Sequence, residues 1–345
     1  MHISAFDYEL PPELIAQQPL AERAASRMLL LDRATQTWTD SQFARLPEYL
    51  RANDALVLNN TRVVPARLEG WRPTSGGVVE LLLIREIESN VWEALARPAR
   101  RLKAGARIQF GRSKLQAEVL ESRDNGIRLI KFDSDKPLEM AIDEVGQTPL
   151  PPYIKREQGL FGDDRERYQT VYASKRGAIA APTAGLHFTP GVLRDVKGLG
   201  VRVAEITLHV GYGTFEPVRV DNVEEHHVAP EWFSIVDEAA QAINNARKNG
   251  GRAIAVGTTT TRALESSATT DGQIEARSGF ANLTIVPGYE FRAVDGLLTN
   301  FHLPRSSLLM MVSAFAGRDL ILDAYRHAAK SGYRFYSYGD CMLIL

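Results

Sequence analysis

Three short segments place histidine among proline, glycine or asparagine, between apolar runs. They are APTAGLHFTP with His187, EEHHVAPEW with His226 and His227, and LLTNFHLPRSSLL with His302. A histidine in a loop with a rigid backbone can exchange protons near neutral pH, so each is a candidate acid or base. A histidine that only satisfies a structural hydrogen bond fits the same pattern, and these segments taken singly do not decide between the two.

A fifth histidine ends a polar row on a predicted strand. In VRVAEITLHVGYGTF, Glu205, Thr207 and His209 alternate with apolar residues, so the three share one strand face. Gly211 and Gly213 follow, where the backbone can turn or approach a ligand closely. A solvent-facing strand side with a hairpin turn is the alternative, but a polar row that leads into His-Val-Gly-Tyr-Gly favours a site.

The segment AIAVGTTTTRALES predicts a buried strand, a tight turn at Gly257 and a helix that begins within the threonine run. The free amides of a helix N-terminus and nearby hydroxyls favour an anion, either phosphate or carboxylate. Simple capping needs one threonine and not four, and Arg262 in the first turn opposes the helix dipole unless it serves a ligand. We therefore expect an anion pocket made by Thr258, Thr259, Thr260, Thr261 and Arg262.

The stretch from residue 97 to 114 carries seven basic residues and no acidic one. It includes Arg97, Arg100, Arg101, Lys103 and Arg107. A nucleic-acid phosphate backbone could bind there without any base being read, while a solvated basic loop is the alternative. Because the formal net charge is −1, any nucleic-acid site must be such a local patch.

Composition excludes several kinds of site. The single cysteine, Cys341, leaves no internal disulfide and no multi-cysteine metal site, which fits a reducing, cytoplasmic location. His226, His227 and Glu231 lack the His-x-x-x-His spacing of a helical metal pair, so no metal is expected. No apolar stretch approaches the roughly 20 residues that span a bilayer, so no membrane association is expected.

Two patterns of predicted strands and helices indicate how these residues are positioned. From 78 to 132 the chain reads as short strands separated by turns, typical of a small β-barrel. After Pro149-Leu150-Pro151-Pro152 strands alternate with helices, including a helix at 237–248 that ends before Gly250-Gly251. Residues 1–64 contain a helix near 43–51 and the apolar strand ALVLN, which is too little for a separate core.

The fold class predicted is therefore α/β, with a larger α/β domain and an inserted small β-barrel domain. Residues 1–64 and 150–345 form the discontinuous α/β domain, and residues 65–149 form the barrel. Ligand sites tend to lie between two such bodies, so we expect the site in that cleft.

Seven segments together resemble one family closely, the S-adenosylmethionine:tRNA ribosyltransferase-isomerases of bacterial queuosine synthesis. They are NNTRVVPARL (59–68), RYQTVYA (167–173), APTAGLHFT (181–189), TLHVGYGTFEPV (207–218), VGTTTTRALES (256–266), LLTNFHLPRSSLLMMVSAFAG (297–317) and YRFYSYGDCMLI (333–344). The resemblance covers essentially the whole chain, and the number and order of the segments make it specific.

The resemblance implies a reaction between S-adenosylmethionine and a tRNA that carries 7-aminomethyl-7-deazaguanine at the wobble position. The products would be epoxyqueuosine-tRNA, adenine and methionine. The donor's sulfonium acidifies the adjacent ribose C5′ hydrogen, so one base, one acid and an anion anchor suffice. S-adenosylmethionine is then a ribosyl-donating substrate, with no cofactor, no obligatory protein partner, and a monomer as the expected state.

The resemblance also completes the set of candidate residues. The catalytic candidates are His209, His187, His302 and Glu231, with base and acid not assigned among the histidines. The substrate-binding candidates are Arg62, Thr183, His226, Tyr212, Thr214, Thr258, Thr259, Thr260, Thr261, Arg262 and Asn300. The basic stretch around Arg97, Arg100, Arg101, Lys103 and Arg107 is the candidate tRNA-binding surface.

Two departures from the family pattern raise the first rival interpretation. Asn60 stands where the family usually has aspartate in Asn-Asp-Thr-Arg, and Ala229 stands where it usually has the second histidine of His-x-Met-His-x-Glu. If these mark a degenerate site, the chain is a catalytically inactive tRNA-binding module, although His187, His209 and Glu231 are retained. An S-adenosylmethionine-dependent methyltransferase is a second rival, but ALVLNNTRVVP lacks the Gly-x-Gly loop that usually follows the first strand of those enzymes.

Overall fold

The computed structural model describes residues 1–111, 113–156, 163–215 and 218–345. Nine strands form one mixed sheet: β1 (Arg27–Asp32), β2 (Thr37–Gln42), β3 (Ala55–Asn59), β12 (Arg202–Leu208), β13 (Glu231–Ile235), β14 (Ala253–Val256), β15 (Arg277–Ala281), β16 (Gly296–Asn300) and β17 (Cys341–Ile344). Their order across the sheet is β15-β13-β12-β3-β14-β16-β17-β1-β2. The central strands β12, β3, β14 and β16 run parallel, so their carboxyl ends meet at one edge.

Both faces of this sheet are covered. In β14, Ala253 and Ala255 point into one core, and Ile254 and Val256 point into another. The first core contains side chains of α4 (Asp237–Lys248), α5 (Thr258–Ser267), α6 (Ser307–Ala316) and α7 (Arg318–Lys330), and the second contains those of α3 (Pro190–Gly198) and the 3-10 helix η4 (Phe43–Tyr49). This burial explains why the central strands read as unbroken apolar runs.

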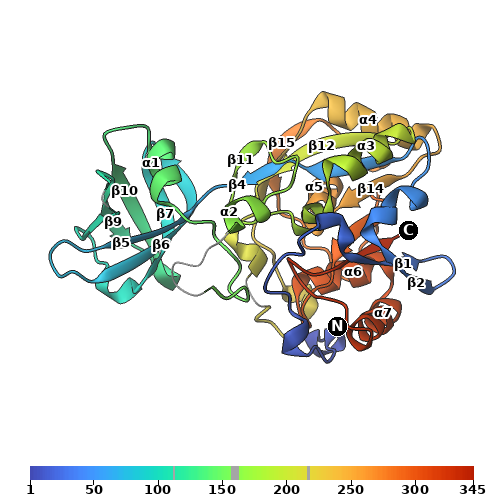
Figure 1. Ribbon diagram of the computed structural model, residues 1–345, viewed down its shortest axis with the longest axis horizontal. Helices are drawn as coiled ribbons and strands as arrows, with labels where there is room; N and C mark the ends of the chain where they lie inside the picture. The colour runs from blue at the N-terminus through green and yellow to red at the C-terminus, as the bar shows by residue number, and fades with distance from the viewer. Residues whose placement is uncertain (112, 157–162, 216–217) are drawn as a thin grey trace.

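A second body is a closed six-stranded barrel with the order β10-β7-β6-β5-β8-β9. Its strands are β5 (Arg67–Trp71), β6 (Val78–Glu88), β7 (Val91–Arg97), β8 (Arg107–Gln109), β9 (Gln116–Ser122) and β10 (Ile127–Asp133), and α1 (Leu138–Val145) packs against it. Figure 1 shows the barrel standing beside the α/β body, which holds both chain termini.

A small sheet and a few side chains join the two bodies. Strand β4 (Thr61–Val63) pairs in parallel with β11 (Lys175–Ala178), and Figure 1 shows the short helix α2 (Asp164–Arg167) at the same junction. Ile179 and Tyr212 of the α/β body pack into the barrel core. Arg176 also forms an ion pair with Asp143 of α1, at 2.9 Å.

The predicted fold class is confirmed, because the α/β body and the closed barrel are both present. The helix at 237–248 is α4 with the predicted bounds, and the barrel strands and α1 lie inside 65–149. The segment near 43–51 is a 3-10 helix that ends at Tyr49, and Pro47 inside it removes a helical N–H donor.

Candidate active site

Three adjoining cavities run along the carboxyl ends of the parallel strands. The inner cavity is lined by Tyr153, Thr183, Val210, Thr258, Thr259, Asn300, His302, Tyr336 and their neighbours. The middle cavity shares Thr258, Thr259 and Leu308 with it and adds Glu231, Arg262 and Ser307. The outer cleft shares Gly213, Val228 and Ser307 with the middle cavity, and Leu95, Asn125 and Ile127 of the barrel form its other wall. This is where ligands bind in open α/β sheets.

An acceptor in the inner cavity has no partner. The Nδ2 atom of Asn300 donates to the carbonyl oxygens of Tyr336 and Asp340, which fixes the orientation of the amide. The Oδ1 atom is buried and accepts no hydrogen bond from the described residues. Since a buried, unpaired carbonyl costs about 1–3 kcal/mol, a ligand donor is the expected partner.

Tyr336 forms an aromatic wall of the same cavity. Its φ of 73° lies in the left-handed region, which is unusual for a bulky residue. The main chain is held there because its N–H donates to Phe301 and its carbonyl accepts from Asn300. Tyr153 packs edge-on against it with ring centroids 3.9 Å apart. A flat ligand would therefore meet aromatic side chains and one fixed acceptor.

The threonine run divides into two pairs. Gly257, with φ of 94°, makes the predicted tight turn, and the first helical bond of α5 runs from Thr261 to Gly257. The backbone N–H groups that precede Thr261 in the helix have no helical acceptor. They lie at the residues Thr258 and Thr259, which line the cavities. Thr260 is different from the expectation: its hydroxyl donates back to Val256.

Thr261 and Arg262 also differ from the expected anion pocket. The Thr261 hydroxyl donates to Gly257, four residues back in the chain. Arg262 is buried and donates to Glu231 at 2.5 Å and to the carbonyl oxygens of Leu283, Ala229 and Ala281. Helix geometry and this ion pair therefore occupy the groups that the sequence assigned to a ligand.

Glu231 holds two elements together. Its Oε2 accepts from Arg262 of α5, and its Oε1 accepts the N–H of Gly211 at 2.9 Å. The carboxylate thereby fixes the chain after β12 against the start of α5. This arrangement favours a positioning role over the proton transfer expected from the sequence.

His187 and His302 are both fully enclosed. His187 lies between Ser26 and Asn300, at 2.8 and 3.2 Å, and His302 contacts Thr299 at 2.9 Å. Burial lowers the pKa of each imidazole to about 3. Both imidazoles are therefore very weak bases, which disfavours them as the group that takes up a proton near neutral pH.

His209 lies outside the three cavities. Its Nδ1 contacts the Thr61 hydroxyl at 2.8 Å, and its ring stacks on Trp232. A side chain at Gly177 of β11 would place its Cβ 2.6 Å from Nε2 of the same ring. The next residue, Val210, does line the inner cavity. The backbone between the two residues therefore separates the His209 ring from that cavity.

His226 and His227 both line the outer cleft, and His226 is the one that contacts the middle cavity through Ser307. His226 is half-buried, its Nε2 contacts the Ser307 hydroxyl at 2.7 Å, and Ser307 lines both the middle cavity and the outer cleft. Desolvation and the neighbouring His227 lower the pKa of His226. An accessible neutral imidazole is suited to accept a proton.

The two departures from the family pattern have local explanations. The Asn60 amide donates to Glu205 and accepts from Thr207, so an aspartate there would face the Glu205 carboxylate. Within the polar row, Thr207 is buried, His209 is half-buried and Glu205 is exposed, so the row faces solvent only at Glu205. Ala229 contributes its carbonyl oxygen to Arg262, a contact that does not depend on its side chain.

The remaining candidates are distributed over the cleft and the barrel. Thr183 lines the inner cavity, Tyr212 lines the outer cleft, and the side chain of Thr214 lies outside the described residues. Arg62 is exposed, and no ion pair is found for it among the described residues. The five basic side chains expected to bind tRNA are all exposed: Arg97, Arg100, Arg101, Lys103 and Arg107.

The basic stretch lies beside the outer cleft. Its 3-10 helix, η5 (Ala99–Arg101), is held by Arg128, which donates to the carbonyl oxygens of Ala99 and Leu102. Ala99 also lies next to Gly126, whose neighbour Asn125 lines the outer cleft. A nucleic acid on this surface would therefore pass the open end of the cavities.

Two searches of the described residues give negative results. No group of three or more His, Cys, Asp and Glu side chains is arranged to hold a metal ion. No described helix is long and apolar enough to cross a membrane.

Comparisons with known proteins agree with this architecture. Residues 3–344 match the family described as queuosine biosynthesis protein. The chain belongs to this family. It is 50% identical over 345 residues to the S-adenosylmethionine:tRNA ribosyltransferase-isomerase of Caldanaerobacter subterraneus subsp. tengcongensis, and 52% identical over 346 residues to that of Moorella thermoacetica, with each chain covered completely.

A solved member of the family has the same fold. The crystal structure of S-adenosylmethionine tRNA ribosyltransferase from Thermotoga maritima is 38% identical, with a TM-score of 0.56. The match covers 99% of this chain and 100% of that one. The family resemblance of the seven sequence segments is therefore confirmed over the whole chain.

Sequence reasoning missed several residues of the cavities. Tyr336 and Ser307 belong to segments that carried the family resemblance, but neither was singled out. The positive φ of Tyr336 has no signal in residue type, because asparagine and glycine are the usual residues there. Ser307 follows the N-cap residue Ser306, so its type alone suggests only a helix start.

Proposed function

We propose that this protein is an S-adenosylmethionine:tRNA ribosyltransferase-isomerase that converts 7-aminomethyl-7-deazaguanine in tRNA to epoxyqueuosine. The observation that carries the proposal is the run of cavities with an unpartnered acceptor, Asn300 Oδ1, at its inner end and the barrel at its outer end. A small donor fits the enclosed end, and a base attached to tRNA enters from the open end.

The inner cavity suits the adenine of the donor. The Oδ1 of Asn300 would accept the 6-amino group, and the rings of Tyr153 and Tyr336 would contact the flat purine. The methionine carboxylate would lie at the free amides of α5, beside Thr258 and Thr259. This placement directs the ribose towards the middle cavity, where the acceptor base can approach it.

The reaction needs a proton acceptor near the ribose C5′, and His226 is the best placed. A base removes the C5′ proton, adenine leaves C1′ as a proton is supplied to its ring, and the substrate amine forms the new bond to carbon. Loss of methionine then closes the epoxide. Glu231 and Arg262 hold the walls of the middle cavity, and His209 braces β12 against β4 through Thr61.

The tRNA would bind along the exposed basic residues of the barrel, which lie beside the outer cleft. We expect S-adenosylmethionine to be the only small molecule required, and a monomer in the cytoplasm to be the working form. These expectations follow from the sequence and the family.

Release of free adenine tests the proposal against its rivals. The purified protein, S-adenosylmethionine and tRNA bearing the aminomethyl-deazaguanine should give adenine and methionine in equal amounts without added metal. A methyltransferase would give S-adenosylhomocysteine, and an inactive binding module would give no product. Either of those results would overturn the proposal.

A further inference from the structure

A further pocket, separate from the three cavities of the candidate active site, lies on the other side of His187 from the inner cavity. Arg23, Arg167, Ser26 and Tyr338 line it, and Ser337 lines both spaces. The His187 ring spans the two, because it contacts Ser26 on one side and Asn300 on the other. None of the arginines here was singled out from the sequence as a binding residue.

Arg23 and Arg167 line this pocket, and Arg334 lies close enough for its charge to act on His187. Arg23 donates to the carbonyl oxygens of Leu186 and Glu166, Arg167 to those of Leu20 and Ala21, and Arg334 to that of Gln18. No ion pair involves any of the three within the part of the chain that the structure describes. The positive charges of Arg23 and Arg334 help to lower the pKa of His187.

Two of these guanidinium groups keep unused donors. The Nε atom of Arg167 and the Nη1 atom of Arg334 are buried and make no hydrogen bond to the described residues. Guanidinium groups with fixed, unpaired donors are suited to bind an oxyanion.

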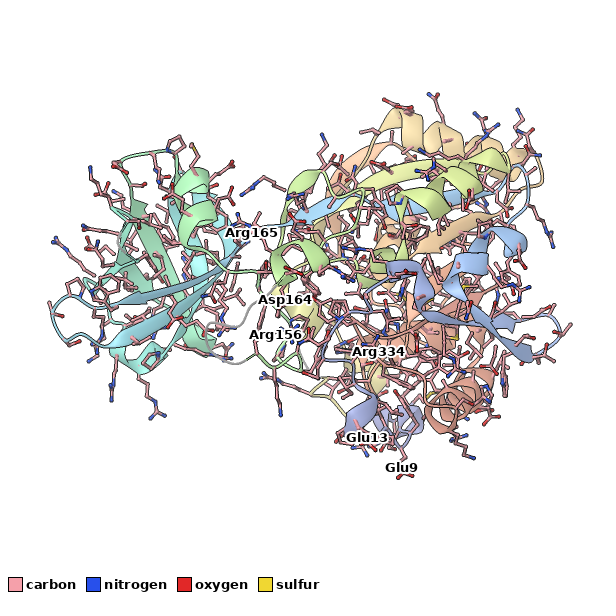
Figure 2. All side chains as sticks on the ribbon, in the orientation of Figure 1. Glu9, Glu13, Arg156, Asp164, Arg165 and Arg334 are labelled. Carbon is pink, nitrogen blue, oxygen red and sulfur yellow. The ribbon has the colours of Figure 1, made fainter. Side chains whose placement is uncertain are left out.

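The carboxylates nearby are already engaged. Asp164 accepts two hydrogen bonds from Arg156, at 2.6 and 3.0 Å, and another from Tyr338. Figure 2 shows Arg156 and Asp164 side by side where the chain between the barrel and the α/β body meets that body, with Arg334 farther into the α/β body. Asp340 accepts the main-chain N–H groups of Arg27 and Arg334. Asp340 offsets part of the charge of Arg334, whereas no described carboxylate forms an ion pair with Arg23 or Arg167, so the site is net positive.

We infer that the pocket of Arg23, Arg167 and Arg334 binds a phosphate group of the tRNA backbone. The methionine carboxylate of the donor fits less well, because its α-ammonium would stand among three cations with no free acid to receive it. The inference rests on the proposed function, since it takes tRNA as the substrate. It adds a contact on the α/β body to the one expected on the barrel.

The test is equilibrium binding of the tRNA, without donor, over a range of salt concentrations. Each of three single substitutions should weaken tRNA binding by roughly tenfold: Arg23→Gln, Arg167→Gln and Arg334→Gln. Each should also lower by about one the slope of the logarithm of the binding constant against the logarithm of the salt concentration. Arg326→Gln is the matched control, since Arg326 is an exposed arginine of α7 that pairs with Asp323 and should leave the slope unchanged. Donor affinity, measured separately, should stay the same in every variant.

If the variants fail to fold, a measurement on the unaltered protein tests the same inference. In synthetic anticodon stem-loops, replacing single phosphates by neutral methylphosphonates should identify one position, outside those lost by the barrel variants, that weakens binding about tenfold. Unchanged tRNA affinity and slope in folded variants, or lower donor affinity instead, would overturn the inference. If tRNA binds as expected but no adenine is released, the proposed reaction fails and the phosphate site stands.

Discussion

At the scale of single residues, the structure separates the histidines that residue type alone makes equivalent. His226 lies in the cleft, whereas His209 contacts Thr61 and Trp232 outside it. Burial explains why the sequence could not make this distinction. The residues next to each candidate histidine in the sequence do not decide its surroundings, and only the fold determines which ring meets the cavities.

Substitutions at the two histidines test this assignment. His226→Ala should lower turnover by about 10² to 10⁴, and His226→Gln should not restore it, because glutamine cannot exchange a proton near neutral pH. His209→Gln should keep most activity by preserving a hydrogen bond to Thr61. Turnover is measured as adenine release, with thermal unfolding as the control. The assignment would be reversed if Gln were tolerated at 226 and not at 209.

The two enclosed histidines predict a loss of stability in acid. The folded pKa of His187 and of His302 is about 3, below the ordinary value of 6.5. Their contribution is therefore complete above about pH 6.5 and is lost as the pH falls towards 3. Each should remove about 2 kcal/mol from the free energy of unfolding between pH 7 and pH 5.

Urea unfolding at the two pH values measures this loss. His302→Gln should lower the stability at pH 7 but reduce its pH dependence by about half of the two-histidine total. An unchanged pH dependence in that variant would show that His302 is not the source. The exposed His2 offers a control, since His2→Gln should leave the dependence as it is.

At the scale of elements, the start of α5 shows that sequence patterns predict local structure but not the partners of side chains. The strand, the turn at Gly257 and the helix start all follow from residue types, because apolar runs, glycine and threonine have local meanings. The partner of Arg262 does not follow, because Glu231 lies 31 residues earlier on another strand. Side chains that pair across elements are set by the fold.

The ion pair between Glu231 and Arg262 should contribute strongly to the stability of the fold. Both side chains are only 4% exposed, so removing one partner leaves a buried charge. Glu231→Gln or Arg262→Met should cost about 3–5 kcal/mol of stability, measured by urea unfolding. The exposed pair of Arg318 and Asp319 is the control, and Arg318→Met should cost under about 1 kcal/mol. Equal effects at the two sites would contradict the buried pairing.

At the scale of the whole molecule, the division into an α/β body and a barrel follows from the change in sequence texture. Strands with turn residues between them predict the barrel, and alternating strands and helices predict the larger sheet. The exact lining of the cavities did not follow, since it combines residues of β16 with residues that come after β12 and β14. Residues that approach from such distant positions have no periodic signature.

Charge reversal on the barrel tests whether both bodies take part in binding tRNA. Replacing Arg97, Arg100 and Arg101 by glutamate should weaken tRNA binding and flatten its salt dependence, because phosphate contacts release counterions. Donor affinity should not change, since the inner and middle cavities, where the donor would bind, are lined by the α/β body. Fluorescence anisotropy with labelled tRNA measures the first and calorimetry the second. Unaltered tRNA affinity would make this stretch a solvated loop.

The central claim is that the ribosyl part of the donor moves to the tRNA base. The direct measurement uses S-adenosylmethionine labelled in its ribose carbons, with the label followed in tRNA and adenine counted in the same reaction. The account predicts one labelled ribosyl group in tRNA for each adenine released, with the metal chelator EDTA present. Label that stays in small molecules, or activity lost to the chelator and restored by zinc, would contradict it.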